Sequence, residues 1–143
     1  MNNLELAEGL LQEAKIRIEY VELDLKQNKD YAFCVRLSQE SVELSIKSML
    51  RVLSIEYSKT YDPGRILEAN RDKLPDWLSE ELNSVTYVSR WLRAEREPSM
   101  YGDEVEGIPP SELYNEDYCV KAMEAARKVL KLAERLIYEV KRK

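Results

Sequence analysis

The sequence contains no histidine, the side chain that most often transfers protons near neutral pH. Without histidine, the chain has no Glu-x-x-His pairs for a di-iron bundle and no partner to activate a nucleophilic serine. Two isolated cysteines do not make a zinc site, and no glycine-rich phosphate loop is present. We therefore expect neither a metal nor a cofactor.

Glycine and proline are also scarce, with four and five residues among 143. So few turn formers leave little room for a loop-rich β fold. No apolar run approaches the roughly 20 residues of a membrane span, and residues 1–5 do not resemble a secretory signal. Cys34 and Cys119 are typical of reduced cytosolic thiols, with a disulfide between them as the alternative. We expect a cytoplasmic protein without a membrane segment.

Charged residues are abundant. They make up 34% of the chain, against 44% hydrophobic residues, and the length is usual for a single domain, here residues 1–143. The net charge of −5 argues against a broad electrostatic surface for nucleic acid, but it leaves room for a local basic cleft. The wealth of Glu, Lys and Arg is typical of heat-adapted proteins.

Apolar residues in the first third of the chain recur at spacings of three and four, which indicates amphipathic helices. The first stripe runs from Leu4 to Leu25, and Asn28 ends its helix. Asp30 can cap a second helix, which extends from about Tyr31 to Ile55. Some apolar residues of this second helix lie outside its main stripe. We therefore expect it to be covered on two sides.

The next region predicts a short helix and a third long one. Asp62 followed by Pro63 is typical of a helix start, and this short helix should extend to about Asn70. The long helix should begin near Pro75. It should end near residue 97, because Pro98 disfavours helical geometry in the residue before it.

Residues 98–114 predict one long irregular segment, and loops of this length are often functional. Asn115 can then cap a last long helix. We find no strand pattern and no internal repeat in the sequence. It predicts an all-α fold, namely an antiparallel bundle of four long helices plus a short helix.

Two stretches carry the candidate functional residues. Between Arg96 and Glu104, a guanidinium at an expected helix end lies close in sequence to a phenol and two carboxylates. On the second helix, three polar residues follow one another at i,i+4 steps and share a face. An arginine can bind phosphate through two hydrogen bonds, so we predict a cleft for a phosphate-bearing partner. The candidate cleft residues are Arg96, Tyr101, Asp103, Glu104, Gln39, Glu43 and Lys47.

Each candidate also has a purely structural interpretation. Arg96 can satisfy carbonyls at a helix C-terminus, and Tyr101 can pack at a dimer interface. The acidic residues after it can form a solvated loop, contact a partner, or hold Arg96 in place. Glu43 and Lys47 can form a weak surface ion pair. Gln39 interrupts an apolar stripe, which indicates either a buried hydrogen bond or a position in the cleft.

The chain resembles the HEPN domain family over nearly its whole length. Residues 31–50, YAFCVRLSQESVELSIKSML, are similar to the family pattern of a tyrosine, alanines, a Gln-containing pair, Glu, Lys and apolar residues. The similarity continues at residues 59–62, where many members have a histidine in place of Tyr61, and is completed by residues 96–104 and 117–129. The resemblance implies an all-α domain.

Active members of this family carry an arginine followed, after four to six residues, by a histidine. They cleave RNA without a metal, using two such pairs that face each other across a homodimer. Arg96 matches the arginine, but the histidine position holds Tyr101. An unperturbed tyrosine ionises near pH 10 and is a hydrogen-bond donor rather than a base at neutral pH. The departure affects cleavage but not phosphate binding.

The resemblance implies a homodimeric module that contacts nucleotide or RNA and pairs with a nucleotidyltransferase in a toxin–antitoxin type system, with impaired catalysis. The alternatives are an atypical metal-independent ribonuclease toxin and a helical scaffold without a ligand. In some members, the partner nucleotidyltransferase attaches AMP to a tyrosine near the Arg–His motif. Tyr101 is therefore the modification candidate, with Tyr114 and Tyr118 as competitors.

Overall fold

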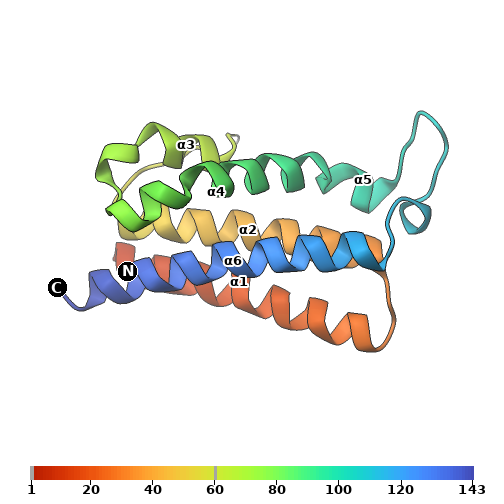
Figure 1. Cartoon of the computed structure of the whole chain (residues 1–143), viewed down its shortest axis with the longest axis horizontal. Helices are drawn as coiled ribbons and strands as arrows, with labels where there is room; N and C mark the ends of the chain where they lie inside the picture. The colour runs from red at the N-terminus through yellow and green to blue at the C-terminus, as the bar shows by residue number, and fades with distance from the viewer. Residues whose placement is uncertain (1, 60) are drawn as a thin grey trace.

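Four long helices form the body of the molecule (Figure 1). The computed structural model describes residues 2–59 and 61–143, so Met1 and Thr60, the latter within the family-like run 59–62, lie outside the described residues. Within these ranges there is no strand, and successive long helices run in opposite directions. The all-α antiparallel bundle predicted from the sequence is confirmed. The long helices are α1 (Asn3–Lys26), α2 (Tyr31–Val52), α4 (Asp76–Ala94) and α6 (Glu116–Lys141).

Short polar side chains begin several helices, as the sequence predicts. The carboxylate of Asp30 accepts the N–H of Phe33 at 3.1 Å at the start of α2. Asp62 caps the short helix α3 (Pro63–Ala69) through the N–H of Gly64, and Asn115 caps α6. Each cap satisfies a backbone donor that has no partner inside its helix.

The end of α2 differs from the prediction. The helix ends at Val52 and not near Ile55, because Ser54 adopts a left-handed conformation with φ of 59°. The N–H of Ile55 then bonds the carbonyl of Leu50 at 2.8 Å, and the N–H of Ser54 bonds that of Arg51 at 3.0 Å. These two bonds form a Schellman motif, which usually has glycine at the left-handed position. Because serine takes the place of the usual glycine, the sequence gives no signal for this helix end.

The region around Pro98 also needs correction. Helix α4 ends at Ala94, and a further short helix, α5 (Arg96–Tyr101), follows it. Pro98 is the third residue of α5, in the first turn, where a backbone N–H has no helical partner to lose. A 3₁₀ turn, η2 (Pro110–Glu112), interrupts the rest of the expected irregular segment, and a second one, η1 (Arg71–Lys73), precedes α4.

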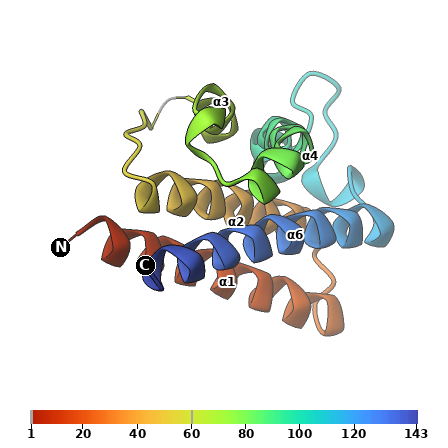
Figure 2. The ribbon, with the colours of Figure 1, turned by 60° about the vertical axis from the view of Figure 1, so that its left-hand side comes forward.

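Helix α2 is the centre of the molecule. Helices α1 and α6 pack on one side of it, and α3, α4 and α5 contact it from the other (Figure 2). Ile46, Met49 and Leu50 of α2 are fully buried, and buried serines such as Ser41 allow close approach of α1. The Ser41 hydroxyl donates to the Ala14 carbonyl of α1 at 2.9 Å. The two-sided cover predicted for this helix is confirmed, and this chain provides it without a second copy.

A small satellite core links α1, α2 and α6. Cys34 and Cys119 are free, buried thiols that pack there with Val21 and Met123. The Cys34 thiol donates to a carboxylate oxygen of Asp24 at 3.1 Å. Hydrogen bonding to Cys119, burial and the nearby Asp24 carboxylate all raise the pKa of the Cys34 thiol. This cysteine is therefore a structural group with little thiolate character.

The segment after α5 forms a projecting hairpin, residues 103–108, which we call the acidic hairpin (Figure 1). Asp103 and Ile108 exchange both backbone hydrogen bonds, at 2.8 and 2.9 Å. The Asp103 carboxylate also accepts the N–H groups of Val105 and Glu106, each at 3.1 Å. These bonds give the hairpin a defined shape although its tip is exposed. No described helix combines the length and the apolar character needed to cross a lipid bilayer.

Gly102, at the base of the hairpin, should tolerate no side chain. Its φ of 79° and ψ of −166° lie in a region open almost only to glycine, and an added Cβ would lie 2.2 Å from the Ile108 carbonyl oxygen. We expect Gly102→Ala to lower the free energy of unfolding by about 3 kcal/mol, measured by urea denaturation. Gly9→Ala is the control. Gly9 is exposed on α1 with no atom within 4 Å of an added Cβ, so this change should stabilise by about 0.5–1 kcal/mol. Equal effects would contradict the argument.

Candidate functional site

An open cleft of about 820 Å³ lies where α5 meets the ends of α2 and α4. We call it the arginine cleft, because three guanidiniums and a single carboxylate line it. Its cationic lining contrasts with the net charge of −5 of the whole chain. The described lining residues are Arg36, Arg93, Ala94, Arg96, Glu97, Pro98, Met100 and Tyr101.

Local helix geometry explains how the three arginines meet. Arg93 belongs to the last turn of α4, and Arg96 opens α5 immediately after the break. Arg36 comes from α2, which crosses beneath α5. The arginines therefore converge from three elements, and the bend between α4 and α5 places two of them at one mouth.

Glu43 holds part of this cluster together. Its Oε1 lies 3.2 Å from Arg93 Nη1 and 3.9 Å from Arg96 Nη1, and its Oε2 lies 3.3 Å from Lys47 Nζ. The Glu43 side chain is only 19% exposed, so these attractions are screened less than those of a surface pair. One carboxylate is thus shared among three cations, which keeps Arg93 and Arg96 side by side while the local charge stays positive.

Glu40 holds the third arginine. Its two oxygens accept from Arg17 Nε at 2.9 Å and from Arg36 Nε at 3.0 Å. Burial alone raises the pKa of Glu40, but the hydrogen bonds and charges of Arg17 and Arg36 outweigh it, and the net result is a lowered pKa. Glu40 therefore remains ionised and orients Arg36 at the edge of the cleft.

This lowered pKa predicts how stability depends on pH. Because the pKa of Glu40 is lower in the folded than in the unfolded chain, where it is about 4.3, ionised Glu40 stabilises the fold above about pH 4. This contribution is lost as the pH falls through the folded-state value. Glu40→Gln should therefore cost about 1 kcal/mol at pH 7, discounted for partial exposure, and less at pH 2.5, in urea denaturation at both values. Glu80→Gln, at an exposed position on α4, is the control, and an equal loss for Glu40→Gln at both pH values would argue against this role.

The three polar residues predicted on one face of α2, Gln39, Glu43 and Lys47, contact one another in sequence order. Gln39 is 3% exposed, and its amide nitrogen lies 3.5 Å from Glu43 Oε1. The Gln39 amide oxygen has no hydrogen-bond partner among the described residues. Glu43 forms the expected i,i+4 pair with Lys47 but also reaches Arg96, the other predicted stretch. The two stretches chosen from the sequence therefore meet at Glu43.

Asp103 and Glu104 lie apart from the arginine cleft. They line a separate cavity of about 470 Å³ beside Tyr114 and Tyr118. This cavity shares only Glu97 and Pro98 with the arginine cleft, so α5 lies between the two. The carboxylate next to Arg96 is accordingly Glu43 and not a residue of the acidic hairpin.

The three tyrosines named as modification candidates have different surroundings. Tyr101 lines the arginine cleft and is 61% exposed. Tyr114 is buried and donates its hydroxyl to Glu95 Oε1 at 2.7 Å. Burial and this hydrogen bond raise the pKa of Tyr114. The hydroxyl of Tyr118 accepts the indole N–H of Trp91 at 2.9 Å. Of the three, Tyr101 is the most exposed to another molecule.

Sequence analysis missed two of the three arginines. Arg36 precedes Glu43 by seven residues and Glu40 by four, so it shares a helix face with both. Arg93 precedes Arg96 by three residues. These spacings were the signal in the sequence that Arg36 and Arg93 could belong to the site. The signal is weak, because most arginines on helix surfaces are simply solvated. Only the contact between α2 and α5 makes these two part of a site.

The arrangement suits the recognition of phosphate groups. Planar guanidiniums bind phosphate oxygens in pairs, and Tyr101 offers a ring and a hydroxyl at the same cleft.

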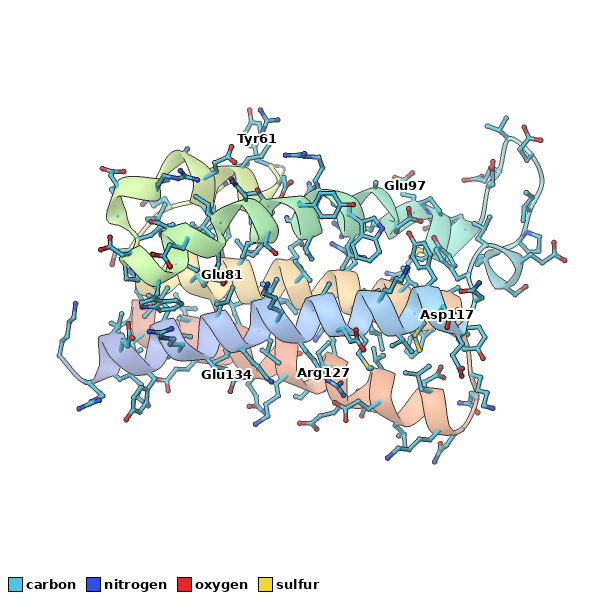
Figure 3. All side chains as sticks on the ribbon, in the orientation of Figure 1. Tyr61, Glu81, Glu97, Asp117, Arg127 and Glu134 are labelled. Carbon is cyan, nitrogen blue, oxygen red and sulfur yellow. The ribbon has the colours of Figure 1, made fainter. Side chains whose placement is uncertain are left out.

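Figure 3 shows where the cleft lies on the molecule. Its lining residue Glu97 lies on the upper edge in that view, whereas Arg127, which is not part of the cleft, lies on the opposite side, between α6 and α1. The described residues contain no group of three or more Cys, Asp and Glu side chains placed to hold a metal ion.

Comparison with known proteins gives one family. No curated protein matches the chain. The family model of the HEPN domain matches residues 7–137, a span that includes α2 and every described residue of the arginine cleft. The match covers most of the sequence and agrees with the all-α bundle. The chain therefore belongs to the HEPN domain family.

Proposed function

We propose that this chain is a homodimeric HEPN module of the cytoplasm that binds nucleotide or RNA in the arginine cleft. We further propose that it pairs with a nucleotidyltransferase in a toxin–antitoxin type system. The observation that carries the proposal is the convergence of Arg36, Arg93 and Arg96 on one open cleft in a chain of net charge −5. Membership of the HEPN family supports a nucleotide or RNA as the bearer of the phosphates.

The chemistry of the cleft supports binding. Each guanidinium presents donors in a fixed plane that fits two phosphate oxygens. The exposed ring of Tyr101 can stack on a base, a contact that single-stranded nucleic acids commonly offer. Glu40 and Glu43 orient the arginines before the ligand arrives, which lowers the entropic cost of binding.

We propose that cleavage is impaired. Tyr101 follows Arg96 after four residues, at the position where active family members have histidine, and the whole sequence lacks histidine. A general base contributes roughly 10²–10⁴ in rate, so its loss should leave affinity intact and chemistry slow. An atypical ribonuclease is the alternative function, and the scaffold without ligand is a third.

Exposed apolar side chains beside the cleft support the homodimer. Phe33 and Met100 are 44% and 39% exposed and line a cavity of about 400 Å³. This cavity shares Arg36 and Met100 with the arginine cleft, so the two form a continuous surface. A second copy of the chain that covers Phe33 and Met100 would bring two copies of Arg96 near a common axis.

The exposure of Tyr101 supports it as the site of AMP attachment by the partner nucleotidyltransferase. An attached phosphate would carry negative charge close to Arg96 and would compete with RNA for the cleft. We expect peptide mass spectrometry, after co-expression with the nucleotidyltransferase encoded beside this chain, to find added AMP on Tyr101 and not on buried Tyr114. Modification of another tyrosine with Tyr101 unmodified would refute this assignment.

The central experiment measures binding and cleavage together. Fluorescence polarisation with a labelled single-stranded RNA and with labelled ATP should detect binding that weakens as salt rises. Gel analysis of the same RNA should show it intact, and sedimentation equilibrium should show a dimer at micromolar concentration. Absence of binding to both ligands would favour the scaffold. Cleavage that is lost in Arg96→Ala would favour the ribonuclease.

A further inference from the structure

The acidic hairpin is a second charged feature at this end of the molecule. Glu104, Val105 and Glu106 form its tip and are exposed, Val105 to 93%. The Asp103–Ile108 backbone pair and the two bonds to the Asp103 carboxylate hold this tip in one shape. An ordered turn that exposes an apolar side chain between two carboxylates is suited to contact another protein surface.

The acidic hairpin is complementary to the arginine cleft. The cleft combines guanidiniums with exposed Met100 and Tyr101, and the hairpin combines carboxylates with exposed Val105. Carboxylates bind arginine with the same paired geometry as phosphates. Glu104 and Glu106 can therefore use the donors that a phosphate-bearing ligand would use.

Within one chain, the hairpin and the cleft are kept apart. Every described lining residue of the arginine cleft comes from Arg36 or from residues 93–101. The hairpin residues Asp103 and Glu104 line the other cavity, across α5. In Figure 1 the hairpin projects away from the end of the bundle beyond α5. A cleft that receives this hairpin must therefore belong to another copy of the chain.

We propose that, in the homodimer, the acidic hairpin of each copy occupies the arginine cleft of the other and competes there with the phosphate-bearing ligand. This inference rests on the proposed homodimer and on the proposed ligand site. Two-fold symmetry allows both hairpins to be exchanged at once. Without a ligand, each cleft is then occupied by the hairpin of the other copy. A phosphate-bearing ligand binds only by displacing Glu104 and Glu106.

The physical consequence is a threshold for ligand binding. In a dimer, the hairpin is present at a high effective concentration, so even weak ion pairs occupy the cleft for much of the time. The ordered turn adds little conformational entropy cost to this contact. The apparent ligand affinity equals the intrinsic affinity of an open cleft multiplied by the fraction of clefts that the hairpin leaves open.

Cross-linking tests the contact directly. One tagged copy carries Val105→Cys and a differently tagged copy carries Tyr101→Cys, and both retain the buried native thiols. Mild oxidation of the mixture should yield a disulfide-linked heterodimer on a non-reducing gel. The control pairs Val105→Cys with Tyr138→Cys, an exposed position near the end of α6 remote from the hairpin, and should give little product.

The outcomes separate the two proposals. Sedimentation that shows a dimer, without the Val105→Cys to Tyr101→Cys product, would refute hairpin exchange and leave the homodimer standing. A monomer would refute both. Cross-linking combined with no RNA binding even by Glu104→Gln/Glu106→Gln would support the exchange contact and refute the ligand site.

Competition is tested by removing the charges of the tip. The double variant Glu104→Gln/Glu106→Gln should bind the labelled single-stranded RNA about tenfold more tightly, since two partly exposed ion pairs contribute roughly 1 kcal/mol or less each. Glu112→Gln/Glu124→Gln changes the net charge equally at exposed positions outside the hairpin and should have a much smaller effect. Equal tightening by both double variants would show a general charge effect and overturn the competition.

Discussion

The Tyr101→His variant is expected to cleave single-stranded RNA about 10²–10⁴ times faster than the unmodified chain, because it adds a general acid–base group at the cleft. Position 101 already lines the cleft together with Arg96, from which it is separated in sequence by four residues. An imidazole with a pKa near 6.5 can exchange protons at neutral pH, and active HEPN members cleave RNA with an arginine and a histidine at this spacing. The change restores that pair and leaves the bundle untouched, since side chain 101 is 61% exposed.

The measurement is the cleavage of a labelled single-stranded RNA, followed on gels in the presence of a metal chelator. The rate of Tyr101→His should respond to pH between about 5.5 and 7.5, the range in which histidine titrates. Tyr101→Phe is the matched control and should gain nothing, since it adds no titrating group. The double change Tyr101→His/Arg96→Ala should lose the gain. If Tyr101→His binds RNA but remains inactive, the missing histidine is not what limits this chain.

The Arg36→Ala/Arg96→Ala double variant is expected to bind single-stranded RNA about 100-fold more weakly, because hydrogen bonds to charged groups contribute about 1.5–3 kcal/mol each. Both guanidiniums line the cleft, and neither arginine is among the buried residues that form the core. The double change leaves Arg93 and Lys47 beside Glu43 and Arg17 beside Glu40, so neither half-buried carboxylate loses all its partners. The loss should therefore reflect binding and not unfolding.

Fluorescence polarisation over a range of salt concentrations measures this effect. The double variant should also show a shallower dependence of affinity on salt, since fewer phosphates are neutralised. Arg127→Ala is the control. Arg127 pairs with Glu22 at 2.9 Å on the side of the molecule remote from α4 and α5 (Figure 3). Equal weakening by Arg127→Ala would mean that the RNA responds to overall charge and that the cleft has no special role.

Helix beginnings were predictable from the sequence, whereas two helix ends were not. Asp30, Asp62 and Asn115 cap their helices through bonds to residues two or three positions away, so local sequence suffices. The end of α2 depends on Ser54 in a left-handed conformation, which sequence does not signal in a serine. The break between α4 and α5 escaped prediction because Pro98 fits the first turn of a new helix as well as it ends an old one.

The candidate site divides in a similar way. Arg96 and Tyr101 were found from a short motif, and the structure places both at one cleft. Glu43 was found from its spacing on α2, but its contact with Arg96 was not foreseeable because the two residues lie more than fifty positions apart. Asp103 and Glu104 are close to Arg96 in sequence, yet they lie across α5 from the cleft.

The sequence by itself determined the helices, the bundle class and the absence of a histidine base, because periodicity, caps and composition are local properties. Tertiary structure alone decided that Arg36 of α2 joins Arg93 and Arg96 in one cleft, and that α5 separates this cleft from the acidic hairpin. The physical reason is the packing of α2 against α5. It unites charges that are distant along the chain, whereas α5 separates Arg96 from Asp103 and Glu104, its neighbours in sequence.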